Sequence, residues 1–183
     1  MIFILALSLC AIASATDENI VEDLGWQFLD IRDLVRVEAR LAVTLRTHTT
    51  RTPFRCQSAR KIKEHPDMKY EYNLKGRKGS DEHAEYISGN VNISLELTKH
   101  NEKYRATYTD KAGTKFTTWL MYKEDEEKCY VTFVQKSDNQ RGCEMLVEVP
   151  ELTSGSHEKC RSFFAEHCQG ERVQLYEENC RYD

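Results

Sequence analysis

The chain has 183 residues, 31% of them charged, and a formal net charge of −4. This mildly acidic balance argues against nucleic acid or an anionic membrane surface as a partner, because both attract basic proteins. The length fits one domain that can enclose a core or a cavity, and no repeat, low-complexity tract or linker divides it.

Residues 1–15 have the pattern of a signal peptide. Residues 2–9 are apolar apart from Ser8, and Ala13-Ser14-Ala15 supplies the small residues of a cleavage site. The apolar run is too short to cross a bilayer, so we expect cleavage and no membrane anchor. We therefore assign 1–15 to a signal peptide and 16–183 to one secreted, extracellular domain.

Residues 18–35 predict a helix. Its apolar residues fall on one helical stripe: Ile20, Leu24, Phe28, Ile31 and Leu34 or Val35. Gly25-Trp26 interrupts the pattern, so the segment forms one helix or two short ones. We expect Trp26 to be a core residue at the end of the fold.

From residue 37 the apolar period changes to two, which is typical of strands. Alternating runs cover 39–46, 70–74, 91–97, 104–108, 116–122, 129–134 and 143–148. A loop around Pro53 precedes Cys56, and turns are expected at 75–80 and 110–113. Roughly eight strand-like runs with a helix at each end predict a mainly β fold, an eight-stranded antiparallel up-and-down barrel. Such a barrel leaves no exposed sheet edge and can hold one small ligand.

Removal of Cys10 with the signal peptide leaves six of the seven cysteines. They are Cys56, Cys129, Cys143, Cys160, Cys168 and Cys180. An even number in an oxidising compartment predicts three disulfides, although spacing alone does not choose the pairing.

A second helix is expected over 157–169. Ser156 is placed to cap its first turn, and Gly170 follows its end, where a left-handed residue is favoured. Its apolar face carries Cys160, Phe163, Phe164 and Cys168. This face must pack on something, and its two thiols need partners, so we expect the helix to lie on one face of the sheet.

Because side chains on a strand alternate between its two faces, neighbouring residues of the cysteine strands point to opposite sides of the sheet. If Cys129 and Cys143 face a helix outside the barrel, Tyr130 and Glu144 face inward. A buried carboxylate needs water, a tyrosine hydroxyl, an arginine or a cationic ligand beside it. A structural hydrogen bond and a ligand contact both remain open for Glu144.

No motif of a hydrolase, a metalloprotease, a P-loop or a dinucleotide-binding fold occurs in the sequence. There is no CxxC motif, and the six histidines are scattered. We therefore expect no enzymatic activity, no cofactor and no metal site. Asn92-Ile93-Ser94 is a glycosylation sequon on the polar face of its strand.

The cysteine framework carries a family resemblance. The order Cys129, Cys143-Glu144, Cys160-x-x-x-Phe164-x-x-x-Cys168 and Tyr176-x-x-x-Cys180 resembles the salivary lipocalins of ticks, the histamine-binding protein family. Phe54-Arg55-Cys56 and the N-terminal helix are similar too, so the resemblance covers essentially the mature chain. It implies a lipocalin barrel with its C-terminal helix outside, and disulfides Cys56–Cys180, Cys129–Cys160 and Cys143–Cys168.

The resemblance also implies a function. Such proteins capture histamine, serotonin, leukotrienes or other lipids and so suppress inflammatory or haemostatic responses of the host. The alternative is a protein-binding inhibitor of a host defence protein such as complement, and a secreted enzyme is a third, less favoured interpretation. We expect a monomer with a small-molecule ligand.

This sequence departs from the amine-binding members at two positions. Tyr130 replaces an aspartate, and Leu146 replaces an aromatic residue, while Glu144 is kept. With one carboxylate missing, weak or absent histamine binding and a neutral or anionic lipid ligand are expected. If a monoamine binds, Glu144 should meet its ammonium. The candidate ligand contacts are Glu144, Tyr130, Tyr104, Tyr108 and Trp119.

Overall fold

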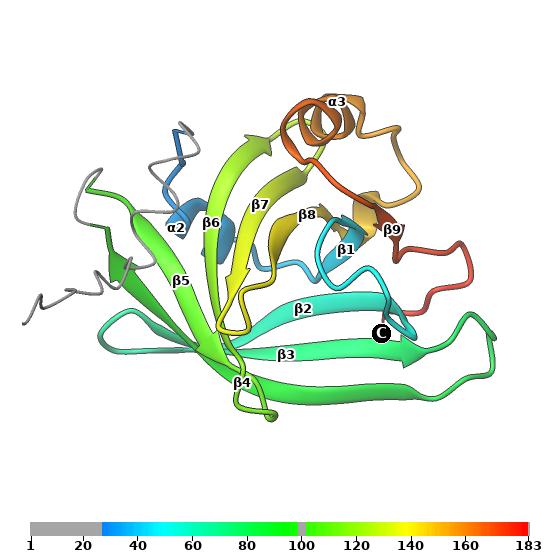
Figure 1. Cartoon of the computed structure of the whole chain (residues 1–183), viewed down its shortest axis with the longest axis horizontal. Coiled ribbons are helices and arrows are strands. Elements are labelled where there is room, and N and C mark those ends of the chain that lie inside the picture. Colours follow the sequence, from blue (N-terminus) through cyan, green and yellow to red (C-terminus); the bar gives the residue numbers. More distant parts are fainter. Residues whose placement is uncertain (1–26, 99–101, 183) are drawn as a thin grey trace, which may run out of the picture.

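The computed structural model describes residues 27–98 and 102–182. Eight antiparallel strands form most of it: β1 (Leu41–Arg46), β2 (Phe54–His65), β3 (Lys69–Lys78), β4 (Tyr86–Leu97), β5 (Tyr104–Thr109), β6 (Lys115–Glu124), β7 (Cys129–Lys136) and β8 (Arg141–Glu148). From β2 to β8 each strand pairs with the next, β8 pairs with β1, and β1 pairs with β2 (Figure 1). This closed arrangement confirms the expected up-and-down barrel.

The alternation along the strands separates two apolar clusters. The outer cluster includes Trp119, Val131, Phe133, Met145 and Val147, and it continues into the C-terminal helix through Cys160, Phe164 and Cys168. The inner cluster includes Leu41, Val43, Leu95, Ala106, Leu120, Tyr130 and Leu146. The barrel wall is therefore apolar on both faces where the helix covers it.

Helix α3 (Glu158–His167) lies across the outside of β6, β7 and β8 (Figure 1). Cys160, Phe164 and Cys168 are buried against the strands, as the expected helical face requires. The predicted cap by Ser156 was wrong, because His157 is the N-cap residue and its side chain forms no cap hydrogen bond. A carboxylate of the β6–β7 turn takes that role, since the Lys159 amide donates to Glu127 at 3.2 Å.

Three disulfides tie these parts together: Cys56–Cys180, Cys129–Cys160 and Cys143–Cys168. The pairing implied by the family resemblance is therefore the one found. Two of the bonds fix α3 on β7 and β8, and the third joins the C-terminal segment to β2.

Of the N-terminal helix expected over 18–35, residues 18–26, including Trp26, lie outside the described residues. The described part contains only the short helix α2 (Arg32–Val35). Ile31 and Val35 belong to the inner cluster, and the Ile31 amide donates to the Tyr104 carbonyl at 3.3 Å. Residues 31–35 therefore cover the barrel end where β5 begins. None of the helices described is long and apolar enough to cross a membrane.

The remaining short elements are a 3₁₀ turn, η1 (Val149–Glu151), and the two-residue strand β9 (Val173–Gln174). β9 pairs with β1. It adds a ninth strand that the sequence did not predict.

A glycan on Asn92 is a prediction for the outer surface. Asn92 is exposed on β4, where it lies opposite Glu71 of β3. We expect the protein secreted from a eukaryotic host to lose apparent mass after treatment with an N-glycan amidase. Asn92→Gln should abolish this shift, and an unchanged wild-type mass would refute the prediction.

Candidate functional site

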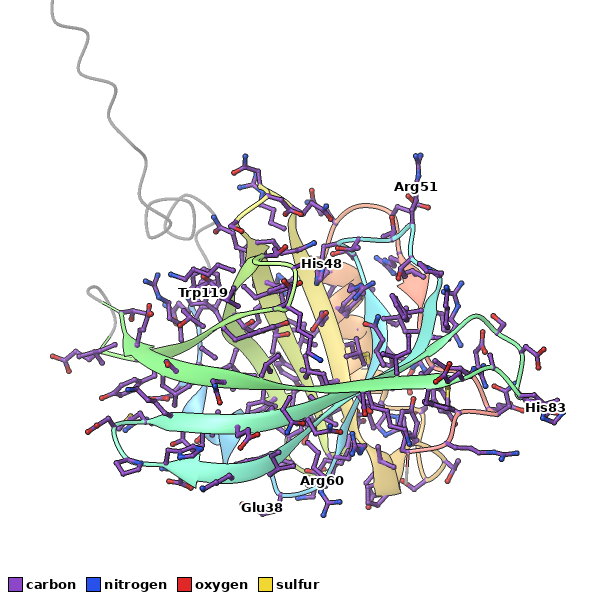
Figure 2. All side chains as sticks on the ribbon, turned by 90° about the horizontal axis from the view of Figure 1, so that it is seen from below. Glu38, His48, Arg51, Arg60, His83 and Trp119 are labelled. Carbon is purple, nitrogen blue, oxygen red and sulfur yellow. A yellow bond between two sulfur atoms is a disulfide. The ribbon has the colours of Figure 1, made fainter. Side chains whose placement is uncertain are left out.

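A polar group lies inside the barrel at the end formed by the β1–β2, β5–β6 and β7–β8 turns. The register places Arg46 of β1 directly opposite Glu144 of β8, and both belong to the inward phase. Arg46 Nη1 lies 3.9 Å from Glu144 Oε1, and His48 Nε2 lies 3.1 Å from the same oxygen. The His48 contact is at ion-pair distance, although it is not aligned as an ideal hydrogen bond. Figure 2 shows His48 among the strands, in contrast to Arg51, Arg60 and His83 at the periphery.

Arg46 is almost completely buried, with 8% of its side chain exposed. Its Nη1 donates to the Gln57 side chain at 2.9 Å and its Nη2 donates to the Thr49 carbonyl at 3.1 Å. Its Nε is enclosed and has no hydrogen-bond partner among the described residues. The pKa of Arg46 is lowered by burial, but a guanidinium stays charged in proteins. The arginine is thus a buried cation with one donor unused.

Glu144 is surrounded by protein atoms, yet water reaches 20% of its side chain. Burial raises the pKa of this carboxyl, but the contact with His48 and the positive charge of Arg46 outweigh burial and hold the pKa below its usual value. Glu144 is therefore ionised at neutral pH. Arg46 and His48 therefore already lie beside this carboxylate, and its contact with a ligand stays a prediction.

Tyr108 lies at the same end of the barrel. Its ring stacks on Phe116 of β6 with 4.6 Å between centroids, and Lys136 Nζ lies 5.4 Å from the Phe116 ring. Burial and the nearby Glu144 carboxylate raise the pKa of the Tyr108 hydroxyl, so it stays protonated and can donate a hydrogen bond. These aromatic faces lie beside the Arg46, His48 and Glu144 group.

The opposite end holds a second polar group. The Tyr130 hydroxyl donates to Glu148 Oε1 at 2.9 Å, and burial followed by this bond raises the pKa of the tyrosine. Within the part of the chain that is described, Glu148 has no cationic side chain at ion-pair distance. Tyr104 is nearby in the inner cluster, with the Arg32 guanidinium 4.6 Å above its ring.

The candidate contacts Glu144, Tyr130, Tyr104 and Tyr108 all come from the inward phase of their strands. Trp119 does not, and this departs from the expected set. It is paired with Phe133 in the register and lies in the outer cluster between Phe28 and Phe133, at centroid distances of 5.9 and 5.8 Å. Trp119 therefore supports the packing outside the barrel.

Sequence reasoning missed Arg46, His48 and Glu148. Strict alternation over 39–46 would place the side chains of Val43 and Arg46 on opposite faces of the strand. A bulge between Val43 and Leu45 shifts the register, so that both side chains face into the barrel. Glu148 could have been found, because it shares the phase of Glu144 and Leu146.

The lowered pKa of Glu144 predicts an acid-dependent stability. A carboxyl whose pKa is lower in the folded state stabilises the fold above its unfolded pKa, and this contribution is lost as pH falls through the folded value. We expect the urea midpoint of the wild type to fall below pH 4.5 more steeply than that of Glu144→Gln. Equal slopes for both proteins would contradict the ionised state proposed for Glu144.

The fold and the interior groups define a ligand-binding barrel of the lipocalin type. The chain belongs to the family described as tick histamine binding protein, because the model of that family matches residues 26–182.

Two solved structures share the fold. One is Japanin from Rhipicephalus appendiculatus bound to cholesterol, with a TM-score of 0.55, 11% identity and coverage of 79% of this chain and 96% of that chain. The other is a serotonin complex of AM182, with a TM-score of 0.53, 14% identity and coverage of 79% and 86%. A comparison with curated proteins found no match.

Proposed function

We propose that this protein is a secreted lipocalin that captures a small amphipathic host mediator and acts by sequestration, without catalysis. The ligand's apolar part would lie against the inner cluster, and its polar head would meet Arg46 and Tyr108. Removal of such a mediator would suppress inflammatory or haemostatic responses at a feeding site. The membership in this family and the ligands in the two similar structures support capture of a small molecule.

The contacts that Glu144 already makes decide which class of ligand we propose. A carboxylate that already faces Arg46 and His48 offers little to an ammonium. At 3.9 Å, the Arg46–Glu144 pair is longer than a hydrogen bond, so Glu144 compensates the charge of Arg46 only in part. An oxygen acceptor on the ligand satisfies this arginine better than a second cation would. We therefore favour a lipid with a carboxylate or another oxygen-rich head.

A matched ligand pair tests this choice. A leukotriene as the free acid should bind more tightly than its methyl ester, because a charged hydrogen bond contributes roughly 1.5–3 kcal/mol. Arg46→Gln should lower affinity for the acid about tenfold or more and leave the ester little changed. Arg60→Gln is the control, since Arg60 is exposed on β2. Equal binding of acid and ester by the wild type would refute the proposed head-group site.

Glu148 supports a second candidate, an amine. Its one hydrogen-bond partner among the described side chains is the Tyr130 hydroxyl, so its charge is less compensated than that of Glu144. Tyrosine rings at this end can face a cation. If serotonin binds, Glu148→Gln should abolish binding and Glu144→Gln should not. The reverse result would assign the ammonium to Glu144.

Extraction of the purified protein with organic solvent separates capture from protein inhibition. A co-purifying small molecule supports the filled barrel. A protein that carries no ligand and binds none of the acids or amines would instead favour the alternative, an inhibitor of a host protein that uses the loops of the barrel.

A further inference from the structure

The barrel is closed where β1 meets β2, and the line between these two strands is here called the seam. These strands pair directly at two positions, Leu41 with Ala59 and Ala42 with Ser58. The C-terminal residues 173–180 are here called the strap, and beyond Ala42 its residues 173–175 lie between β1 and β2. The Leu175 amide donates to the Thr44 carbonyl of β1 at 2.9 Å, and the Leu175 carbonyl accepts from the Cys56 amide of β2 at 2.7 Å. One residue of the strap thus bonds to both sides of the seam.

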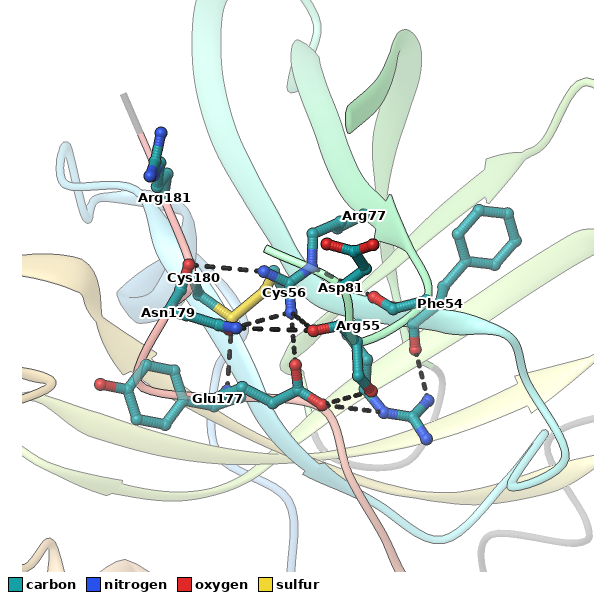
Figure 3. A network of polar contacts seen from close by, with 12 residues as sticks. Phe54, Arg55, Cys56, Arg77, Asp81, Glu177, Asn179, Cys180 and Arg181 are labelled. Atoms are coloured by element: carbon teal, nitrogen blue, oxygen red, sulfur yellow. Dashed lines mark hydrogen bonds and ion pairs between the residues drawn. A yellow bond between two sulfur atoms is a disulfide. The ribbon is translucent and has the colours of Figure 1, made fainter. Parts of the chain in front are cut away.

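A disulfide and a polar network around the buried Arg77 hold the strap on β2 and β3 (Figure 3). Arg77 of β3 is completely buried and donates to Glu177 and to Asn179 Oδ1, the latter at 2.9 Å. Glu177 also lies 3.5 Å from Arg55 of β2 and accepts from the Ser80 hydroxyl at 2.7 Å. Together with Cys56–Cys180, these contacts hold the strap at several points.

The seam passes directly beside Arg46. On the inside, the bond from Arg46 to Gln57 joins β1 to β2 across the seam, next to Cys56. Along the wall, the backbone of Arg46 is paired with Val173. Leu175, which is 0% exposed, belongs to the inner cluster. The strap therefore covers the part of the wall that carries the arginine.

We propose that the strap is a positioning element for ligand binding. It holds β1 and β2 at a fixed separation and so keeps the Arg46 guanidinium aligned toward the ligand head. Arg77 and Glu177 act as positioning residues through Leu175 and touch no ligand. The ligand-binding consequence rests on the proposed head-group site, but the structural consequence does not depend on any ligand.

Two variants loosen the strap in different ways. Cys56→Ala with Cys180→Ala removes its covalent tie, and Glu177→Gln weakens the network while all three disulfides stay. The matched controls are Cys143→Ala with Cys168→Ala, which loosens α3 outside the barrel, and Glu96→Gln, which weakens the Arg105–Glu96 pair of β4 and β5. Glu177→Gln keeps the test possible if the double variant fails to fold.

The first readout needs no ligand. Hydrogen exchange of the amides of residues 56 and 175 should become about tenfold faster in the strap variants and stay unchanged in the controls. The side-chain Nε NMR signal of Arg46 should shift in the strap variants alone. Unchanged exchange and an unchanged Arg46 signal would overturn the proposal, whether or not the wild type binds a lipid.

The second readout is the affinity for cis-parinaric acid, a fluorescent fatty acid. Strap variants should bind it about tenfold more weakly, with little further loss when Arg46→Gln is added, because both changes act on one interaction. Faster exchange with full retention of affinity would overturn the positioning role. A wild type that binds no parinaric acid, together with faster exchange and a shifted Arg46 signal, would contradict the head-group site and leave the strap's hold on Arg46 supported.

Discussion

Arg77→Met is expected to destabilise the protein by about 3–5 kcal/mol, because it removes a buried charge with its hydrogen bonds and leaves several acceptors without their donor. Arg77 is 0% exposed, and its guanidinium bonds to Glu177, Asn179 and the carbonyls of Gly79 and Ser80. Its loss removes several hydrogen bonds at once. Urea unfolding followed by circular dichroism should show a lower midpoint with an unchanged slope.

The control for this prediction removes both charges. Arg77→Met with Glu177→Leu should be more stable than Arg77→Met alone, because Glu177 would otherwise lie beside the apolar replacement with only its longer ion pair, to Arg55 at 3.5 Å. If Arg77→Met alone costs less than about 1 kcal/mol, the network is no stronger than an exposed ion pair.

Phe164→Ala is expected to cost about 3–5 kcal/mol, the range measured for large-to-small changes in well-packed cores. Phe164 is 0% exposed between Cys160 and Cys168 on the face of α3 that meets the barrel. The two disulfides of this helix prevent it from closing over the cavity that the change creates. Urea unfolding measures the loss.

Phe163 provides the matched control in the same helix. It is partly exposed and stacks on Tyr122 with 4.6 Å between centroids, so Phe163→Ala should cost roughly 0.5–1.5 kcal/mol. Neither change should alter ligand affinity, because both residues lie outside the barrel. Equal losses for the two variants would contradict the placement of Phe164 at the centre of the outer cluster.

The period-two pattern was enough to predict the barrel, because β4 to β8 each have apolar residues on alternate positions. β2 was obscured. Its residues 60–65 are mostly charged, the largely buried Lys61 donates to the Val35 carbonyl at 3.0 Å and pairs with the exposed Glu38, and two bulges break the alternation. A strand whose inward positions are polar gives no alternating signal, so only its pairing partners reveal it.

The candidate site was predictable only in part. The disulfide framework gave the phase of β7 and β8, and this correctly turned Tyr130 and Glu144 inward. Trp119 was misplaced because the alternation of β6 alone does not say which phase faces the helix. Arg46 was missed because a bulge is set by tertiary packing. The strap could not be predicted, since a two-residue strand gives no periodic signal.

Calorimetric titration with a leukotriene, histamine and serotonin at neutral pH tests the central claim most directly. Because Arg46 and His48 already lie beside Glu144, we expect the leukotriene to bind, Arg46→Gln to weaken it about tenfold or more, and histamine to give little or no heat. Tight histamine binding that Glu144→Gln abolishes would contradict the account, because it would show that Glu144 is available to an ammonium.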